Sequence, residues 1–210
     1  MLDPFDPDSF IVRVEAHILG IEPRISRTLE LPVGLNLALL HEVLQAAFGW
    51  TDSHLHQFLI GGLTFGAPEF DEDGLFDHRT FEATETRLID FTFSYDEKKP
   101  LHILYEYDFG DCWRHHIDMH RVPREQGANY PRCTAGSRSG PPEDVGGTYG
   151  YAEFLDAWRD PEHEDHRQMR TWVGKKFEPE RFDLEATNKQ IGRAMRAAKG
   201  GYRFRRVRAS

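Results

Sequence analysis

Histidine and aspartate residues recur at short spacing in two parts of the chain, and both residue types bind metal ions or transfer protons. In the stretch around residues 50–58, His54 and His56 stand two positions apart. Side chains two positions apart share one face of a strand, so both imidazoles can approach a single zinc ion. Two ligands do not complete a metal site, and the remaining ligands would have to come from another part of the chain.

The second stretch, residues 105–120, reads YEYDFGDCWRHHIDMH and has the pattern of a strand, a tight polar turn and a second strand. Asp108 and Asp111 stand at the turn and His115 follows it. One interpretation is a core hairpin with a solvated outer face, in which Asp111 forms the turn. The other is a pocket at the end of a sheet, lined by these three residues. The residues alone leave both interpretations open.

A third segment adds two acids inside a long loop rich in Gly and Pro, residues 123–150. Glu143 and Asp144 follow a Pro-Pro pair and precede Gly146-Gly147, so rigid and flexible backbone alternate there. Long loops in compact domains are often functional, but this one could equally cover an edge of the sheet. It is not a phosphate-binding loop, because no Lys-Ser/Thr pair follows the glycines.

A shared site requires these three segments to meet in space. The candidate pocket residues are His54, His56, Tyr107, Asp108, Asp111, Trp113, His115, Glu143 and Asp144. A divalent metal would be held by His54, His56, Asp108 and Asp111, and no other cofactor is indicated. The pocket would serve either to bind a ligand or partner, or as a metal-dependent or acid/base enzyme. In a third interpretation these residues only satisfy each other's hydrogen bonds.

Alternating and helical spacing of apolar residues predicts the elements that must position these segments. Asn36 as a cap and Gly49 as a stop delimit one helix, and a helical pattern recurs in residues 151–158 and 162–173 and again from Leu184 onward. The expected strands are residues 11–18, 25–31, 55–60, 87–95, and the two arms of the 105–120 hairpin.

Strands joined by short turns favour antiparallel pairing. We therefore expect antiparallel hairpins within residues 11–31 and 105–120, followed by a long Gly/Pro-rich loop and by a basic C-terminal helix and tail.

Charge is unevenly distributed along the 210 residues. Residues 189–210 carry +8 and residues 1–188 carry −17, which together give the net charge of −9. An acidic body repels nucleic acid, so only a weak contact through Lys189–Arg208 is expected. The chain has no apolar run long enough for a bilayer, no signal peptide, and two cysteines in no disulfide framework, Cys112 and Cys133. These features predict a cytoplasmic protein without a membrane partner.

The order of four motifs resembles the plasmid pRiA4b ORF-3-like protein family. The motifs are WTDSHLHQF at residues 50–58, YDFGDCW at 107–113, PPEDVGG at 141–147 and FEPERFD at 177–183. The resemblance implies an α+β fold, in which helices pack on a largely antiparallel sheet, and a domain over residues 10–185 that is followed by the basic helix and tail over residues 186–210. The family is bacterial and archaeal, and its members are mostly uncharacterised. Some members are described as resolvase-like (TnpR) or as passenger proteins of mobile elements.

The resemblance therefore implies an accessory protein of mobile elements that binds a ligand or partner. Resolvase activity is not expected, because a serine recombinase needs an activated serine beside arginines and no such group is evident. The chain also departs from the family pattern. Gly140 and Val145 stand where some members have cysteines, so a cysteine-based metal site is not expected here.

Overall fold

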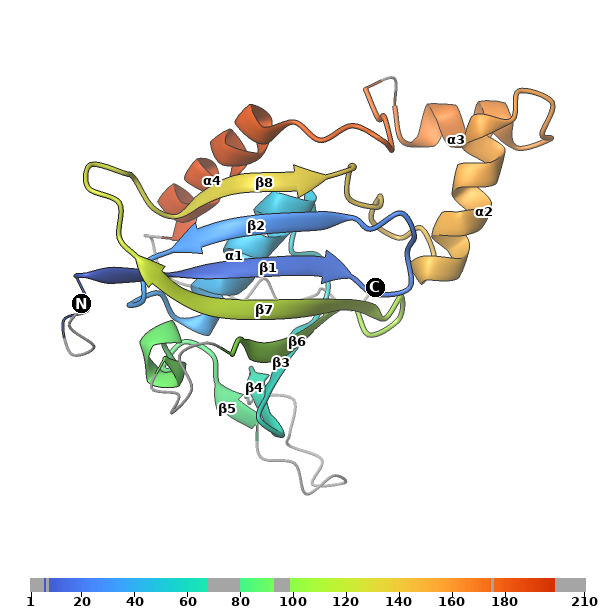
Figure 1. Cartoon of the computed structure of the whole chain (residues 1–210). Coiled ribbons are helices and arrows are strands. Elements are labelled where there is room, and N and C mark those ends of the chain that lie inside the picture. Colours follow the sequence, from blue (N-terminus) through green and yellow to red (C-terminus); the bar gives the residue numbers. More distant parts are fainter. Residues whose placement is uncertain (1–5, 7, 68–79, 93–98, 175, 199–210) are drawn as a thin grey trace.

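The computed structural model describes residues 6, 8–67, 80–92, 99–174 and 176–198. Within them the chain forms an α+β fold on one eight-stranded sheet (Figure 1). The strands are β1 (Phe10–Ile18), β2 (Ser26–Leu31), β3 (His56–Ile60), β4 (Leu63–Gly66), β5 (Thr80–Glu82), β6 (Leu101–Tyr107), β7 (Trp113–Pro123) and β8 (Arg132–Ser137). The helices are α1 (Leu37–Phe48), the 3-10 helix η2 (Leu88–Phe91), α2 (Gly147–Arg159), α3 (His166–Trp172) and α4 (Leu184–Ala198).

The sheet has the order β5-β4-β3-β6-β7-β1-β2-β8. Every neighbouring pair is antiparallel except β4 with β5. The predicted 105–120 hairpin is the β6–β7 pair, in which Tyr105 lies opposite His115 and Tyr107 opposite Trp113. All four of these side chains are buried, as the alternation predicts.

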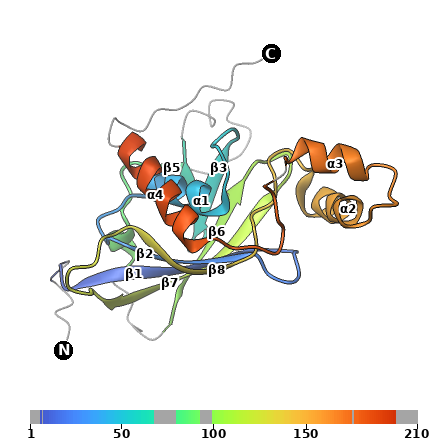
Figure 2. The same cartoon turned by 90° about the horizontal axis from the view of Figure 1, so that it is seen from above.

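Two helices cover one face of the sheet. In Figures 1 and 2, α1 and α4 lie on the same side, and the described residues place no helix on the other. The predicted ends of α1 are confirmed: the Asn36 side chain accepts a hydrogen bond from the Leu39 amide, and Gly49 adopts a left-handed conformation. The core lies between these helices and the sheet, and α2 and α3 lie beyond the sheet's end (Figure 2).

The strand expected over residues 87–95 is not formed in the part that the structure describes. Residues 88–91 form η2 instead, and residues 93–95 lie outside the described residues. The Leu88 and Ile89 amides donate to the carbonyls of Leu35 and Val33, and Asp90 caps the turn at Arg87. These bonds to the segment before α1 replace strand pairing, which the alternating apolar residues alone did not reveal.

The segment expected as one long loop, residues 123–150, contains β8 and the start of α2. β8 pairs with β2 and forms one edge of the sheet. Its sequence, RCTAGS, has little strand propensity, and its pairing depends on contacts made by distant residues. Gly136 lies so close to Phe182 that a Cβ atom there would be 2.7 Å from the ring. The loop thus supplies an edge strand in its first half, while residues 138–146 remain without helix or strand.

Among the described residues, no helix is both long and apolar enough to cross a lipid bilayer.

We predict that Asn188→Ala destabilises the protein by about 1–3 kcal/mol, because Asn188 satisfies both backbone groups of Cys133 on the open side of β8. Urea unfolding at neutral pH measures the change. The matched control is Lys189→Ala on the same helix, whose ion pair with Glu185 is exposed to solvent and contributes little to stability. Equal stability of both variants would contradict this role of Asn188.

Candidate functional site

Three segments far apart in the sequence meet at one end of the sheet. The Trp50 indole donates to the Pro141 carbonyl over 2.9 Å, and the Gly146 amide donates to the Asp111 carboxylate over 3.0 Å. Gly147 has a φ of 68°, and a Cβ atom at this position would overlap the Asp111 carbonyl. Only glycine allows the loop to approach the β6–β7 bend this closely.

The convergence surrounds one imidazole with three carboxylates. The His54 Nε2 atom lies 2.9 Å from Asp144 Oδ1, 3.5 Å from Asp108 Oδ2 and 4.0 Å from Glu143 Oε2. We call these four residues the His54 cluster. His54 comes from the segment before β3, Asp108 follows β6, and the other two residues precede α2. The ring of His54 is 29% exposed, so small solutes can reach the cluster from solvent.

Each carboxylate is held by groups outside the cluster. Glu143 accepts hydrogen bonds from the Thr51 amide at 2.8 Å and from the Tyr107 hydroxyl at 3.1 Å. Burial, together with the charge of Glu143, raises the pKa of Tyr107, so its hydroxyl stays a neutral donor. Asp108 Oδ1 accepts from the Gly110 amide at 2.9 Å, which leaves Oδ2 directed at His54.

An aspartate in a left-handed backbone conformation occurs in each of the three segments. Asp52 has a φ of 55°, Asp108 of 55° and Asp144 of 57°. Aspartate tolerates this region better than most residues, because its side chain bonds nearby backbone groups. Backbone conformations of this kind gather at functional sites, so their coincidence at the meeting point supports a role for the site.

Aromatic rings form the floor beneath the His54 cluster. Trp50 stacks on Tyr107 with ring centres 5.0 Å apart, and its edge contacts His115 at 5.2 Å. Trp113 packs against Trp50 from the other side of the bend. Tyr107 and Trp113 from the predicted pocket are therefore core residues. Tyr107 contacts the cluster through its hydroxyl at Glu143 and through its ring at His54, with ring centres 5.8 Å apart.

His115 does not line the site, because it is completely buried in the core. Its Nε2 atom has no hydrogen-bond partner among the described residues. Burial lowers the pKa of His115 to about 3, although backbone hydrogen bonds to Tyr105 and Trp113 act in the opposite direction. The imidazole therefore remains neutral in the folded protein at ordinary pH.

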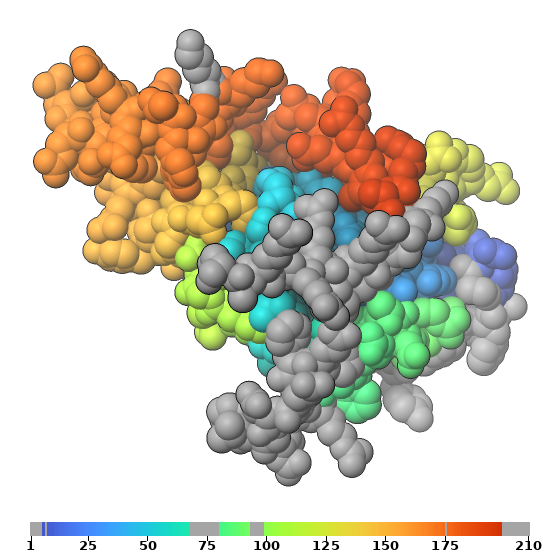
Figure 3. Space-filling view, turned by 180° about the vertical axis from the view of Figure 1, so that it is seen from behind, coloured from blue at the N-terminus to red at the C-terminus, as the bar shows by residue number. Residues whose placement is uncertain are grey.

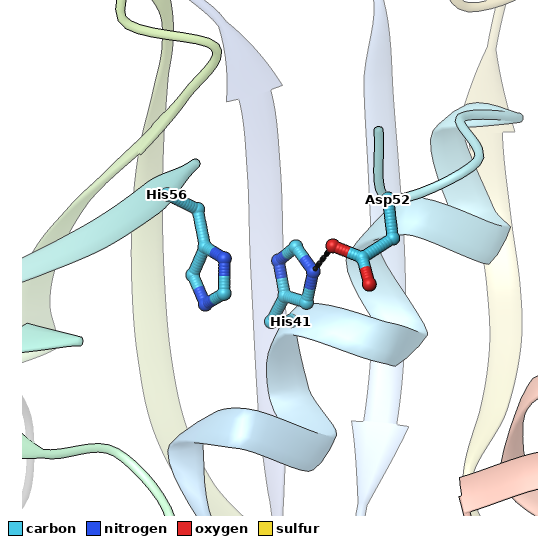
Figure 4. A group of neighbouring side chains, drawn as sticks. All are labelled: His41, Asp52 and His56. Atoms are coloured by element: carbon cyan, nitrogen blue, oxygen red, sulfur yellow. Dashed lines mark hydrogen bonds and ion pairs between the residues drawn. The ribbon is translucent and has the colours of Figure 1, made fainter. Parts of the chain in front are cut away.

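His56 also lies apart from His54 and belongs to a second group with His41 and Asp52 (Figure 4). The rings of His41 and His56 are stacked, with centres 3.5 Å apart and planes at 8°. Ligand lone pairs lie in the ring plane, so two parallel stacked imidazoles cannot both direct them at one ion. Burial, and then the neighbouring His41, lower the pKa of His56 well below its usual value.

The buried His41 joins a hydrogen-bond network that the sequence did not predict. Its Nδ1 lies 2.8 Å from the Tyr105 hydroxyl and its Nε2 2.8 Å from Asp52. Gln45 donates to the same Tyr105 hydroxyl and accepts from the Asp52 amide. His41 is thus a core histidine with both nitrogens satisfied.

The four residues considered for one metal ion are divided by the structure. His54 and Asp108 remain together and are joined by Asp144. Asp111 bonds the Gly146 amide and so fastens the loop, while His56 belongs to the His41 group. The strand alternation that put His54 and His56 on one face does not apply, because β3 begins only at His56.

A groove of about 1070 Å³ has Glu143 and Asp144 in its lining. The C-terminal end of α1, the segment after α3 and the first turns of α4 complete it. Figure 3 shows the face on which α4 lies beside the α2–α3 pair. The groove gives a larger molecule a place to bind beside the His54 cluster.

The predicted nucleic-acid contact through Lys189–Arg208 lies partly outside the described residues. In the described part, α4 packs on α1 and β8, and its basic residues Lys189, Arg193 and Arg196 are exposed. Lys189 forms an ion pair with Glu185 at 2.6 Å.

Comparison with known proteins gave matches along most of the chain. The family model described as "Plasmid pRiA4b ORF-3-like protein" matches residues 10–186. The uncharacterised protein y4hQ of Sinorhizobium fredii is 35% identical over 187 residues, covering 88% of this chain and 90% of that protein. The crystal structure of MM3350, a protein of unknown function from Methanosarcina mazei Go1, matches with a TM-score of 0.73 at 34% identity, over 85% of this chain and 96% of that one.

The low pKa of His115 leads to a prediction about acid stability. Between about pH 6.5 and pH 3, His115 is protonated in the unfolded chain and neutral in the folded protein. The free energy of unfolding therefore falls as pH falls, by about 1.4 kcal/mol per pH unit. We expect His115→Phe to remove this contribution, which urea unfolding at several pH values between about 4 and 6 measures. The control Ile117→Val changes the same strand without removing a titrating group. If the free energy of unfolding of His115→Phe falls with pH as steeply as that of the wild type, the pH dependence does not come from His115.

Proposed function

This chain belongs to the plasmid pRiA4b ORF-3-like protein family, and on that premise we propose that its His54 cluster binds a divalent cation which recruits an anionic ligand into the adjoining groove. The observation that carries the proposal is the convergence of one imidazole and three carboxylates from three distant segments.

The spacing of the donor atoms supports a cation in this position. Neighbouring ligands of an octahedral ion with bonds of about 2.1 Å lie about 3 Å apart. His54 Nε2 lies 2.9 Å from Asp144 and 3.5 Å from Asp108, so small side-chain movements bring these atoms around one ion. Mixed nitrogen and carboxylate donors suit manganese or zinc better than calcium, which takes oxygen ligands.

The charge of the cluster also favours a cation. Asp108, Glu143 and Asp144 lie around a single imidazole, so even a protonated His54 leaves an excess of negative charge. Glu143 and Asp108 are anchored by hydrogen bonds and cannot readily turn away from each other. A divalent cation would neutralise this charge and create a positive centre for a ligand.

Arg27 supports an anionic ligand in the groove. Its side chain is buried and lies between the rings of Phe48 and Phe182, with its guanidinium carbon 5.0 Å and 4.6 Å from their centres. It bonds backbone carbonyls, including that of Ala47, and pairs with no carboxylate in the part of the chain that the structure describes. A phosphate or carboxylate of the ligand would supply the missing negative charge.

The same arrangement accommodates the enzymatic alternative. A cation held by His54, Asp108 and Asp144 with open coordination positions would lower the pKa of a bound water. Hydrolysis of a ligand in the groove is the class of reaction that such a cation would support. Enzymatic activity would thus depend on the same cation. Loss of cation binding would abolish both ligand recruitment and catalysis.

We predict that the protein binds about one equivalent of Mn²⁺ at this cluster, and that His54→Ala and Asp144→Asn each weaken binding at least about tenfold. Electron paramagnetic resonance of the free ion measures binding. At a Mn²⁺ concentration of about 100 times the dissociation constant of the wild type, the wild type should gain about 2.7 kcal/mol of stability, and His54→Ala, with binding at least about tenfold weaker, should gain no more than about 1.4 kcal/mol.

The control for this experiment is His120→Ala, which removes an imidazole from the strand β7, seven positions beyond Trp113 and so away from the β6–β7 bend at which the three segments meet. It should bind Mn²⁺ as the wild type does. Binding of equal strength in the wild type and His54→Ala would contradict the proposed site, as would the absence of Mn²⁺ binding to the wild type.

A second candidate function is that of an accessory protein of mobile elements that contacts nucleic acid. It is favoured by the exposed basic residues of α4, Lys189, Arg193 and Arg196, followed by the basic tail. The acidic remainder of the chain would keep such a contact weak and sensitive to salt.

We predict a gel shift of DNA at low salt that is lost when these three residues are changed to glutamine. Substitution is preferable to deleting residues 189–210, because α4 packs on α1 and β8. The control replaces the exposed Arg167 and Arg170 of α3 by glutamine and leaves α1 and α4 unchanged. If the wild type does not shift DNA at low salt, the nucleic-acid function is wrong.

A further inference from the structure

A third group of histidine and carboxylate side chains lies on the opposite face of the sheet from α1 and α4. It consists of His17 on β1, His102 on β6, and His116 and Asp118 on β7. We call these four residues the outer-face cluster. In the described part of the chain no helix packs on this face (Figures 1 and 2). The cluster shares no residue with the His54 cluster or with the groove.

The register of three adjacent strands brings these residues together. β7 lies between β6 and β1 in the sheet. His102 is directly opposite Asp118, and His17 is directly opposite His116. Since neighbours along β7, such as His115 and Ile117, face the core, the intervening residues must face outward.

One oxygen atom already joins two of the imidazoles. Asp118 Oδ1 lies 2.6 Å from His102 Nδ1 and 3.0 Å from His116 Nε2. Two nitrogens and one carboxylate oxygen are thus held within 4.8 Å of one another on a hydrogen-bonded sheet. Neighbouring ligands of a tetrahedral zinc ion with bonds of about 2.0–2.2 Å lie about 3.3–3.6 Å apart. Only a slight expansion of the group is needed to admit the ion.

The orientation of the rings distinguishes this group from the His41 group. The rings of His102 and His116 are tilted by 39° with centres 5.5 Å apart, whereas His41 and His56 are parallel and stacked. Tilted rings can direct their in-plane lone pairs at a common point, which stacked rings cannot. His17 lies next to His116, with ring centres 5.3 Å apart. Its ligand atoms lie outside the set held within 4.8 Å, so its side chain would have to move toward the group to supply a fourth ligand in place of water.

Charge and exposure agree with binding of a cation from solvent. The side chain of His102 is 66% exposed and that of Asp118 is 30% exposed. Glu15, on β1, lies opposite Asp118 and adds a second negative charge beside the group. The site is therefore open, partly anionic, and rigid along its backbone.

We propose that His102, His116 and Asp118 form a binding site for a transition-metal ion of the zinc class on the open face of the sheet, with His17 as the fourth ligand. Two imidazoles and one carboxylate suit zinc, nickel and copper better than magnesium or calcium, which prefer oxygen ligands. This site is independent of the cation proposed for the His54 cluster.

Titration calorimetry with Zn²⁺ on chelator-treated His54→Ala protein tests the proposal, because this background lacks the other proposed cation site. We expect about one equivalent of Zn²⁺ to bind, and His102→Ala or Asp118→Asn added to this background to weaken binding at least about tenfold. The matched control adds His120→Ala, which removes an outward-facing histidine two positions beyond Asp118, and should leave the affinity unchanged.

Nitrogen NMR of the histidine rings provides a second readout that does not depend on a substitution. Addition of Zn²⁺ should shift the signals of His102 Nδ1 and His116 Nε2 and leave those of His120 in place. Zinc affinity that is insensitive to both His102→Ala and Asp118→Asn would overturn the proposal, as would unchanged His102 and His116 signals at saturating Zn²⁺. Failure of the Mn²⁺ experiment at the His54 cluster would leave this result unaffected.

Discussion

The structure of the candidate site depends on polar groups that distant segments satisfy. The buried Trp50 indole donates to the Pro141 carbonyl, the Tyr107 hydroxyl donates to Glu143, and the exposed Gly146 amide donates to Asp111. A buried polar group without a partner costs about 1–3 kcal/mol, so separation of these segments would be penalised at Trp50 and at Tyr107. The hydrogen bonds that hold the backbone together also set the positions of the carboxylates around His54.

Ring orientation decides which histidine groups can act as ligands. The chain contains three groups in which imidazoles and carboxylates lie close together in the described residues. In the His41 group, the stacked rings and the two paired nitrogens of His41 favour a structural role in the core. In the His54 cluster and the outer-face cluster, nitrogen and oxygen atoms converge near solvent. Short distances between ligand atoms occur in all three groups. The direction of the nitrogen lone pairs is what distinguishes the His41 group from the other two.

Much of the fold followed from local patterns. The alternation in residues 11–18 and 105–120, and the Asn36 and Gly49 signals, correspond to β1, the β6–β7 hairpin and α1. Periodicity succeeds there because each element buries one continuous apolar face. It failed for β8 and η2, whose backbone bonds are made to β2 and to the segment before α1. An element held mainly by long-range bonds leaves little trace in its own sequence.

By itself, the sequence determined which residues had the chemistry for a site: His54, Asp108, Glu143 and Asp144 were all candidates, since spacing and residue type are local properties. Only the tertiary structure decided that they meet, that His56 and His115 belong to the core, and that Asp111 fastens the loop. The sequence analysis did not identify the outer-face cluster. Its existence depends on strand register, and register is set by pairing between segments that periodicity treats one at a time.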